Sequence, residues 1–511
     1  MGSENNEERE SPVGENDGSS GAGAGPGSGH ESESEYPRKS HPALEAQPLR
    51  QAANGLTLPR ERAQDEVAVP FDARGAVMKL ALPVLGEMSL MTLVSWLDMI
   101  MVGALGTWAI TSVGLSNQPM FLAMSVFMSF NVGATALVAR FTGAGDREGA
   151  SAVARQALTV GVFLGVVLGV LGFTNAREIL LLMGAREDVI GPGTGYLKVI
   201  CVGFVFQASA MSLSATLRGA GDTTTPAMAN AVANVTNLVG NLLLIHGYLG
   251  FPRLEVLGAG IATAISRGVA CLIILGKVIR GDGRLRISLK DSFLPDFRLI
   301  RRILKIGLPA AGEQMLMRAG QMAFARIVSS FGTTVYAAHQ IALNIEGLSF
   351  NIGMAFQTAS TSLVGQKLGS KEPEVAEKAG WAARNLGMMF AGSAGLVFFF
   401  LGRYIALAYT RDPVAVDMSA QALKIIAVAQ PSLATAFILA GGLRGAGDTR
   451  WTMFTTATGI WGVRVLVGYL LAVKAGMGLA GAWIGMALDM TVRAVLITLR
   501  FKGGRWKEIR V

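Results

Sequence analysis

The 511-residue sequence predicts an all-α polytopic membrane protein, with twelve transmembrane helices in two six-helix bundles. Three observations predict this fold. Hydrophobic residues make up 51% of the chain and charged residues only 16%, a more apolar balance than soluble domains usually have. Apolar runs of about 20 residues or more recur along the chain. The second half of the chain also repeats the first at a fixed offset.

Six apolar runs lie in the first half, at roughly 79–104, 113–141, 150–173, 188–217, 223–247 and 256–279. Six more follow, at roughly 303–330, 338–366, 376–401, 415–442, 449–472 and 479–500. Each is long enough to cross a bilayer as a helix. The sequence shows no alternating strand pattern of the barrel type, and only helices or closed barrels satisfy their backbone hydrogen bonds in lipid. The membrane domain is therefore expected to be entirely helical.

The repeat relates the two halves residue by residue. The stretch LRGAGDT at 217–223 recurs at 443–449, an offset of 226. Further pairs at this offset are Glu87 with Glu313 and Gly143 with Gly369. Internal repeats of this size are typical of secondary transporters, whose substrate site lies between the halves.

Basic residues determine the expected orientation, because cytoplasmic loops keep an excess of Lys and Arg. The connection from Lys277 to Lys305 holds nine of them, and the segment from Arg500 onward holds five. Both termini and this central loop should therefore face the cytoplasm, and the net charge of +9 reflects topology and not a nucleic-acid partner. Because each half has an even number of spans, both halves enter from the same side. The pseudo-two-fold axis should then run along the membrane normal.

The N-terminal segment differs from the rest of the chain. Gly, Ser and Glu dominate residues 1–70, and residues 1–35 hold nine acidic side chains against one Arg. This composition predicts a disordered cytoplasmic tail. It also lacks the basic start and apolar core of a signal peptide. The expected domains after the tail are an N-terminal six-helix bundle at 71–280, a cytoplasmic linker at 281–300 and a C-terminal six-helix bundle at 301–511.

The repeated LRGAGDT motif has two interpretations. Gly-rich turns at helix starts can bind anions, yet this motif lacks the spacing and the Lys of a nucleotide-binding loop. Alternatively, its Gly ends one helix and Asp222 or Asp448 caps the next. The second interpretation, a structural corner at the cytoplasmic ends of the fourth and tenth spans, is favoured.

Longer motifs accompany the two corners. They are LALPVLGEMSLMTLVSWLDMIMVGALG in the first span, AAHQIALNIEGLSFNIGMAFQTASTSLVGQKLG in the eighth, WGVRVLVGYLL in the eleventh and RFKGGRWKEIRV at the C-terminal end. Together, the sequence from about residue 75 to residue 511 resembles the multidrug and toxic compound extrusion (MATE) family of efflux transporters, in its prokaryotic type. The resemblance implies a V-shaped pair of six-helix bundles. It also implies export of organic, often cationic compounds in exchange for protons or sodium ions.

Ionisable groups inside spans are functional candidates, since a charge there costs about 2.5–3.5 kcal/mol on insertion scales and normally faces a cavity or a partner. Asp98 lies six to seven residues from the outer end of the first span, roughly 10 Å deep. Tyr196, Gln118, Asn237 and Asn241 reach comparable depths in other spans of the first half. These side chains predict a polar pocket in the first bundle. The alternative is that the two Asn residues form structural hydrogen bonds only.

The family resemblance implies roles within this pocket. MATE proteins carry an acidic residue at the Asp98 position of the motif LDMIMVG, and that residue binds the coupling ion. A Tyr in span 4 and an Asn-x-x-x-Asp pair in span 5 complete the site in archaeal-type members, matching Tyr196, Asn237 and Asn241. The departure is Asn241, where the carboxylate is absent. Either a proton or a Na⁺ ion could therefore bind at Asp98, because hard cations accept carboxylate, amide and hydroxyl oxygens alike.

The second bundle has no equivalent of Asp98, because Phe324 occupies its repeat position. Coupling is therefore expected to be asymmetric. Arg318 in the seventh span and Glu346 in the eighth either form an internal ion pair or contact substrate. Some branches of the family place an acid on span 10, near the position of Gln430. The residues expected to line a substrate cavity are Gln118, Arg318, Glu346 and Gln430.

Two other sets of span charges have structural interpretations. Asp489 and Arg493 have the i, i+4 spacing of a helix-surface pair. Glu87 and Glu313 are related by the repeat, which favours a structural role, with contact to cargo on the inward side as the alternative.

The sequence thus predicts a secondary active antiporter that exports organic cations or amphiphilic compounds by alternating access. A lipid-linked oligosaccharide flippase of related architecture is the second candidate, but its cavity should be strongly basic, whereas these spans carry both signs without a cluster of Arg. A membrane-embedded enzyme is the third, yet no Ser-His, HExxH or paired-Asp motif occurs. The expected partners are small organic substrates and the lipid bilayer, with no nucleic acid and no cofactor. The expected state is a monomer in the plasma (inner) membrane.

Overall fold

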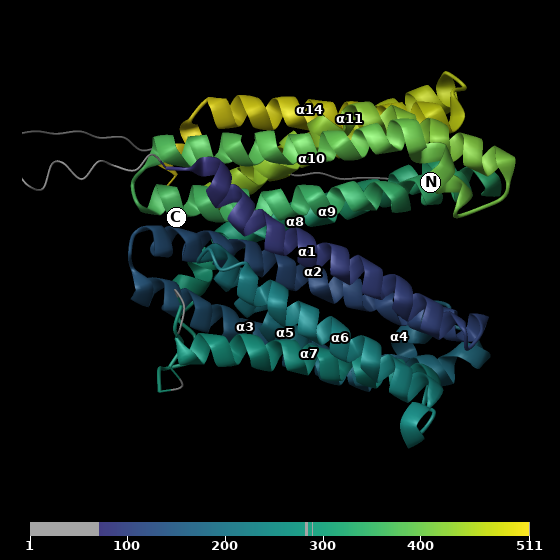
Figure 1. The fold of residues 1–511 in the computed structure, drawn as a ribbon, viewed down its shortest axis with the longest axis horizontal. Coiled ribbons are helices and arrows are strands. Elements are labelled where there is room, and N and C mark those ends of the chain that lie inside the picture. Colours follow the sequence, from purple (N-terminus) through teal and green to yellow (C-terminus); the bar gives the residue numbers. More distant parts are fainter. Residues whose placement is uncertain (1–70, 282–284, 289, 510–511) are drawn as a thin grey trace, which may run out of the picture. The chain divides into compact units, whose positions relative to one another are not determined.

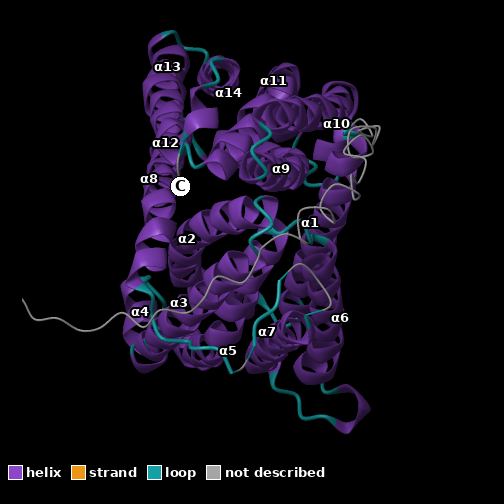
Figure 2. Ribbon diagram, turned by 90° about the vertical axis from the view of Figure 1, so that its left-hand side faces the viewer, coloured by secondary structure: helices purple, strands orange, loops and turns teal. Residues whose placement is uncertain are grey.

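The computed structural model describes residues 71–281, 285–288 and 290–509. These residues belong to one compact unit built from helices, with no strand among them (Figures 1 and 2). The prediction made for residues 1–70 lies outside the described part.

Six long helices form the first half. They are α1 (Ala73–Gly103), α2 (Thr107–Gly143), α3 (Arg147–Thr174), α5 (Glu187–Gly219), α6 (Thr224–His246) and α7 (Glu255–Arg280), with the short α4 (Ala176–Leu182) and η2 (Tyr248–Gly250) in connections. Buried apolar side chains such as Leu137, Val153, Leu213 and Ile274 pack between α2, α3, α5 and α7. This packing gives the first bundle its own core.

The second half repeats this pattern. Its helices are α8 (Phe297–Ser329), α9 (Thr333–Gly369), α10 (Pro373–Leu407), α11 (Pro413–Ala446) and α14 (Gly478–Lys502), followed by η5 (Arg505–Glu508). Its fifth span is one helical run made of α12 (Thr449–Ala457), η3 (Thr458–Val465), α13 (Leu466–Tyr469) and η4 (Leu470–Lys474), in which η3 and η4 are π-helical. With this run counted once, the described residues contain twelve long helices, which confirms the predicted fold.

Ten of the long helices in the described residues are apolar enough to cross a membrane. The two that fall outside this group are α8 and α9, although each is more than 30 residues long. Both helices contact the first bundle through α2, and both supply polar residues, such as Gln321 and Gln357, to a cavity between the bundles. Their lower hydropathy therefore reflects the polar residues that they place at this cavity.

The two LRGAGDT stretches form turns between long helices. Gly221 and Gly447 adopt left-handed backbone angles, with φ of 84° and 90°, which glycine reaches without a β-carbon clash. Asp222 caps α6 by accepting a backbone N–H at 2.9 Å. Asp448 makes no such cap and instead pairs with Arg500 at 2.8 Å. The interpretation as structural corners is confirmed, with side-chain capping at the first corner only.

Repeat-related glycines bring the two bundles into contact beside these corners. A β-carbon on Gly143 would lie 1.8 Å from the carbonyl oxygen of Gln366, and one on Gly369 would lie 2.1 Å from that of Arg140. The side chain of Gln366 donates to a carbonyl at the end of α5 at 2.9 Å, and that of Arg140 donates to one at the end of α11 at 3.0 Å. Because Arg140 and Gln366 are also 226 residues apart, this contact, the glycine joint, has approximate two-fold symmetry.

Candidate coupling and cargo sites

Asp98 on α1 is half-buried and is bound by amide side chains of α6. Asn241 Nδ2 donates to Asp98 Oδ1 at 2.7 Å. With its amide nitrogen turned toward the carboxylate, Asn237 donates to the two Asp98 oxygens at 3.1 and 3.0 Å and accepts from Thr263 Oγ1 of α7 at 3.2 Å. The structure thus brings three of the residues named from the sequence together around one carboxylate.

Two more residues lie within electrostatic range of this carboxylate. Tyr196 on α5 is buried, and its hydroxyl group interacts electrostatically with Asp98. Arg267 on α7 is half-buried and interacts in the same way with Asp98 and with Tyr196. We call this set of six residues the Asp98 pocket; its members are Asp98, Tyr196, Asn237, Asn241, Thr263 and Arg267.

Sequence reasoning missed Arg267 and Thr263. Arg267 could have been found, because it is a charged residue near the centre of the sixth span, where a charge is costly. Thr263 gives no such signal, since a helical Thr can hydrogen-bond within its own helix and needs no partner in another span.

One atom of the Asp98 pocket lacks a partner among the described residues. The side-chain oxygen of Asn241 is buried and accepts no hydrogen bond there. A buried acceptor normally has a donor or a cation beside it. Together with the carboxylate of Asp98, this oxygen could accept a hydrogen bond or ligate a small hard cation.

Gln118 is not part of this arrangement. It lies on α2, is exposed, and makes no hydrogen bond or ion pair with any described residue. It is also absent from the wall of the cavity between the bundles. Similar depth along two helices therefore did not place Gln118 and Asp98 in one site, because depth does not specify which face of a helix turns inward.

A cavity of about 530 Å³ lies between the two bundles, within the size range of small-molecule sites. Helices α2 and α5 line it from the first bundle, and α8, α9, α11, α12 and α14 from the second. Its charged lining residues are Arg218, Arg318, Arg444, Arg493 and Glu313. The expectation that the spans form no cluster of Arg is therefore wrong, because helices distant in the sequence bring four arginines to one cavity.

Arg318 lines this cavity, whereas Glu346 and Gln430 do not. Gln430 is fully buried and accepts a hydrogen bond from Ser349. Glu346 is 1% exposed and interacts electrostatically with Arg464 and Arg493. Both side chains thus lie within the packed interior of the second bundle, and no ion pair joins Glu346 to Arg318 in the described residues.

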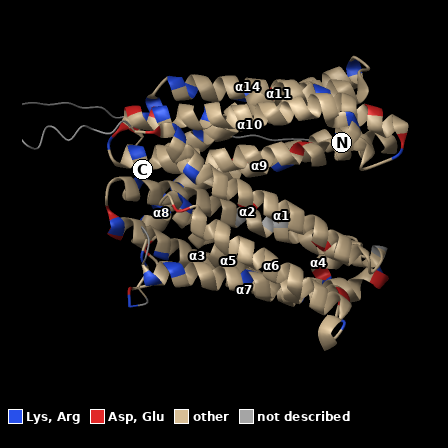
Figure 3. Cartoon of the chain, viewed as in Figure 1, with Lys and Arg blue, Asp and Glu red and all other residues tan. Residues whose placement is uncertain are grey.

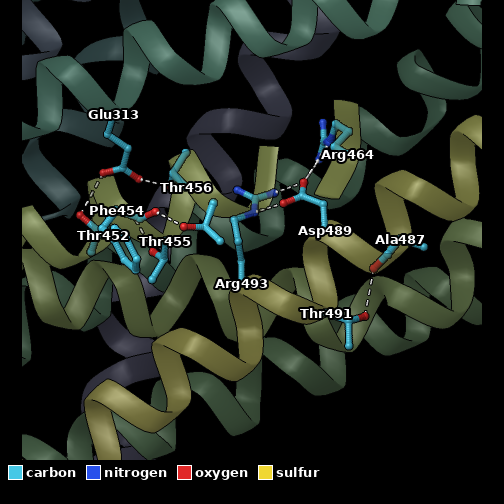
Figure 4. Close-up of polar contacts among 11 residues, drawn as sticks. Glu313, Thr452, Phe454, Thr455, Thr456, Arg464, Ala487, Asp489, Thr491 and Arg493 are labelled. Carbon is cyan, nitrogen blue, oxygen red and sulfur yellow. Dashed lines mark hydrogen bonds and ion pairs between the residues drawn. The ribbon is translucent and has the colours of Figure 1, made fainter. Parts of the chain in front are cut away.

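Asp489 on α14 lies between the side chains of Arg464 and Arg493 (Figure 4). Its Oδ2 accepts from Arg464 Nε at 2.9 Å and from Arg493 Nη2 at 3.0 Å. Asp489 is 0% exposed and Arg493 only 7%. The interpretation of Asp489 and Arg493 as a helix-surface pair is therefore wrong, because this face of α14 packs inward and Arg464 comes from the π-helical η3.

Glu87 and Glu313 form matching ion pairs in the two bundles. Glu87 pairs with Arg218 at 2.6 Å, and Glu313 pairs with Arg444 at 2.6 Å. Asn230 donates to Glu87 at 2.7 Å, while two threonine hydroxyls of α12 donate to Glu313 at 3.0 and 2.9 Å (Figure 4). Each pair joins the first helix of a bundle to the helix that ends at its LRGAGDT corner, α5 or α11, here called the corner helices. This arrangement favours the structural interpretation, although Glu313 also lines the cavity.

Comparison with known proteins agrees with this architecture. The family model described as MatE matches residues 83–243 and again residues 309–470, one match in each bundle. The protein named Probable multidrug resistance protein NorM from Thermotoga maritima is 33% identical over 441 residues, covering 86% of this chain and 94% of that protein. Multidrug resistance protein MdtK from Yersinia pseudotuberculosis is 28% identical, covering 85% and 95%.

A solved structure shows the same fold. It is the outward-facing conformation of a multidrug resistance MATE family transporter of the MOP superfamily, with a TM-score of 0.78 and 25% identity over 85% of this chain and 97% of that one. The two matched segments of the family model cover more than half of the sequence. This chain therefore belongs to the MATE family of membrane transporters and is not an enzyme.

Proposed function

We propose that this protein is a secondary active antiporter that exports amphiphilic organic compounds in exchange for protons or sodium ions, by alternating access between its bundles. The observation that carries the proposal is the Asp98 pocket. It places a carboxylate inside the membrane domain and outside the wall of the central cavity. Ion binding and cargo binding would therefore occupy different sites in one molecule, with no cofactor.

Loading of Asp98 would change the charge balance of its pocket. The ionised carboxylate is countered by Arg267, whose charge lies within electrostatic range. A proton or a Na⁺ ion at Asp98 would cancel the negative charge and leave Arg267 uncompensated. Helix α1 packs against α6 of its own bundle and against α9 and α10 of the other. A charge change on α1 would therefore favour a different packing of α1, as differential ion affinity requires.

The glycine joint would be the contact that alternation breaks. Two helix ends are tied across it to side chains of the opposite bundle. Opening of the molecule at the corner end would break these hydrogen bonds. The opposite ends of the two bundles would then approach each other. Because the joint is built from matching residues of both bundles, each bundle would contribute similarly to this barrier.

The charge distribution supports a cytoplasmic position for the corner end. In Figure 3 most Lys and Arg residues lie at the end of the helices drawn on the left, where the corners are. Positive residues are retained on the cytoplasmic side. We therefore propose cytoplasmic termini, bundles at 71–280 and 301–511 joined by a cytoplasmic linker, and residence as a monomer in the inner membrane.

Transport in everted membrane vesicles tests the proposed function. Vesicles with the protein should accumulate a fluorescent amphiphilic compound when the lumen is made more acidic than the outside or is loaded with more sodium than the outside, and vesicles without the protein should not. Movement of a lipid-linked oligosaccharide across the membrane of the same vesicles is measured as the test for a flippase. Gradient-independent movement of that lipid, with no gradient-driven accumulation of the small compound, would support a flippase instead.

A further inference from the structure

The central cavity is cationic. Among the described residues, four arginines and a single carboxylate, that of Glu313, line it. Glu313 is 5% exposed and already accepts an ion pair and two hydroxyl hydrogen bonds. The carboxylate therefore has little capacity left for a positively charged cargo.

Three of the four arginines are already neutralised by acids of the fold. Arg218 pairs with Glu87 and Arg444 with Glu313, while Arg493 and Arg464 share Asp489 and have Glu346 within electrostatic range. These three guanidinium groups line the cavity, and carboxylates of the protein balance their positive charge. They are positioned by their partners, so they contribute hydrogen-bond donors more than free charge.

Arg318 is the exception. It lies within α8, lines the cavity, and is exposed to that space. Among the described residues it makes no hydrogen bond and no ion pair. A guanidinium inside a membrane domain is costly unless an anion or a polar partner compensates it. The partner of Arg318 is therefore expected to come from outside the described residues, and a bound cargo molecule is the candidate that the cavity itself offers.

A second group at the cavity also lacks its partners. Asn131 on α2 lines the cavity and is 5% exposed, and neither its side-chain nitrogen nor its oxygen forms a hydrogen bond within the described residues. Gln314 and Gln321 are four residues before and three after Arg318, on the same side of α8, and both line the cavity. The lining residues that the structure describes thus offer one free cation and several amide groups.

The rest of the wall is apolar. It includes Met128, Met211, Met317 and Met354, together with Phe350 and Phe437, whose rings meet edge to face with centroids 5.0 Å apart. Thioether and aromatic side chains adapt to ligands of varied shape. Such a wall suits the hydrophobic body of an amphiphile whose charged group reaches Arg318.

We propose that the cargo of this cavity is an amphiphilic organic monoanion, a carboxylate or a sulfonate, bound through Arg318. This refines the proposed exporter function and rests on it. A planar guanidinium can donate two parallel hydrogen bonds to a carboxylate or a sulfonate. An organic cation would instead meet an unbalanced like charge and no free carboxylate among the described lining residues. A lipid-linked pyrophosphate carries more negative charge than one unpaired arginine balances.

Binding of three matched fluorescent probes to the purified full-length protein in nanodiscs tests this proposal. Dansylglycine carries a carboxylate, dansyl-ethylenediamine an ammonium group, and dansylamide no charge, on one fluorophore. The wild-type protein should bind dansylglycine about tenfold more tightly than dansyl-ethylenediamine. Arg318→Gln should remove this preference, and Arg318→Lys should retain part of it because the positive charge remains.

Arg326→Gln is the matched control, since Arg326 is an exposed arginine on α8 outside the cavity wall. This variant should keep the wild-type preference. Tighter binding of the ammonium probe, or an unchanged anion preference in Arg318→Gln, would overturn the proposal. The measurement uses no ion gradient, so it can fail while antiport stands. Loss of the anion preference together with intact gradient-driven transport would therefore contradict the cargo proposal alone.

Discussion

Each bundle carries an aspartate within its long helices, but the two side chains have different environments. In the first bundle, Asp98 is half-buried, accepts hydrogen bonds from amide groups, and has Arg267 within electrostatic range. In the second bundle, Asp489 is 0% exposed and contacts two guanidinium groups at 2.8 Å. The direct partners of Asp98 are thus neutral amides, whereas those of Asp489 are two cations.

The internal repeat shows which residue takes the position of Asp98 in the second bundle. The residue of the second bundle that corresponds to Asp98 is Phe324, which is 3% exposed. Its ring lies 5.7 Å from that of His339, which in turn lies 5.7 Å from Trp483. An aromatic cluster thus fills the space that a carboxylate occupies in the first bundle. We infer that the first bundle exchanges ions, while the second has a fixed charge network that stabilises it.

The largest expected effect is a loss of stability in the Asp489→Asn variant. Removal of this carboxylate leaves two buried guanidinium groups without their directly bonded anion and should lower the free energy of unfolding by about 3–5 kcal/mol. Asp98→Asn should cost about 1 kcal/mol or less, because amide partners also accommodate a neutral side chain. Thermal unfolding of both variants in the same detergent measures this contrast. Equal losses would show that the two aspartates have the same role.

At the glycine joint, in contrast, the two bundles should behave alike. Gly143→Ala and Gly369→Ala each place a methyl group against a backbone carbonyl, so each should destabilise the closed joint by about 1–3 kcal/mol. Gly114→Ala on α2 is the control, since nothing lies within 4 Å of the position that its added methyl group would take, and a helical Ala is favoured there. Thermal unfolding should show similar losses for the two joint variants. A loss in one variant alone would argue against a shared, symmetric joint.

A smaller effect is expected when the first bundle gains a second acid. Asn241 donates directly to Asp98 at 2.7 Å, so Asn241→Asp would place two carboxylates side by side. Neighbouring carboxylates share a proton more readily than one alone. The pH optimum of transport should therefore shift upward, by about one unit. Initial efflux rates against pH at a fixed gradient measure the shift, and superimposable profiles for the two proteins would contradict the proposed role of this pair.

Much of the fold could be predicted from the sequence, because its signals are local or periodic. Apolar runs predicted the helices, and the offset of 226 paired Glu87 with Glu313, whose ion pairs to the corner helices match at 2.6 Å. The family resemblance directed attention to Asp98. Its hydrogen bond with Asn241 could be seen only in the structure, because the depth of a residue in its span does not show which helix its side chain faces.

The cavity could not be predicted for the same reason. Arg318 was a candidate from its depth, but its lack of a partner among the described residues depends on the faces of α8 and α9. Glu346, its expected partner, turns into the core of the second bundle. Similarly, the spacing of Asp489 and Arg493 suits an exposed helix, and only packing against η3 shows that the pair is buried.

The most direct test of the account separates ion coupling from cargo movement in Asp98→Asn. Proteoliposomes should be assayed twice, for cargo efflux driven by a proton or sodium gradient and for cargo exchange at equal ion concentrations. Asp188→Asn, an exposed acid at the start of α5, provides the control and should match the wild-type protein in both assays. We expect Asp98→Asn to lose gradient-driven efflux while it retains equilibrium exchange. Gradient-driven efflux at the wild-type rate in Asp98→Asn would contradict the assignment of coupling to the Asp98 pocket.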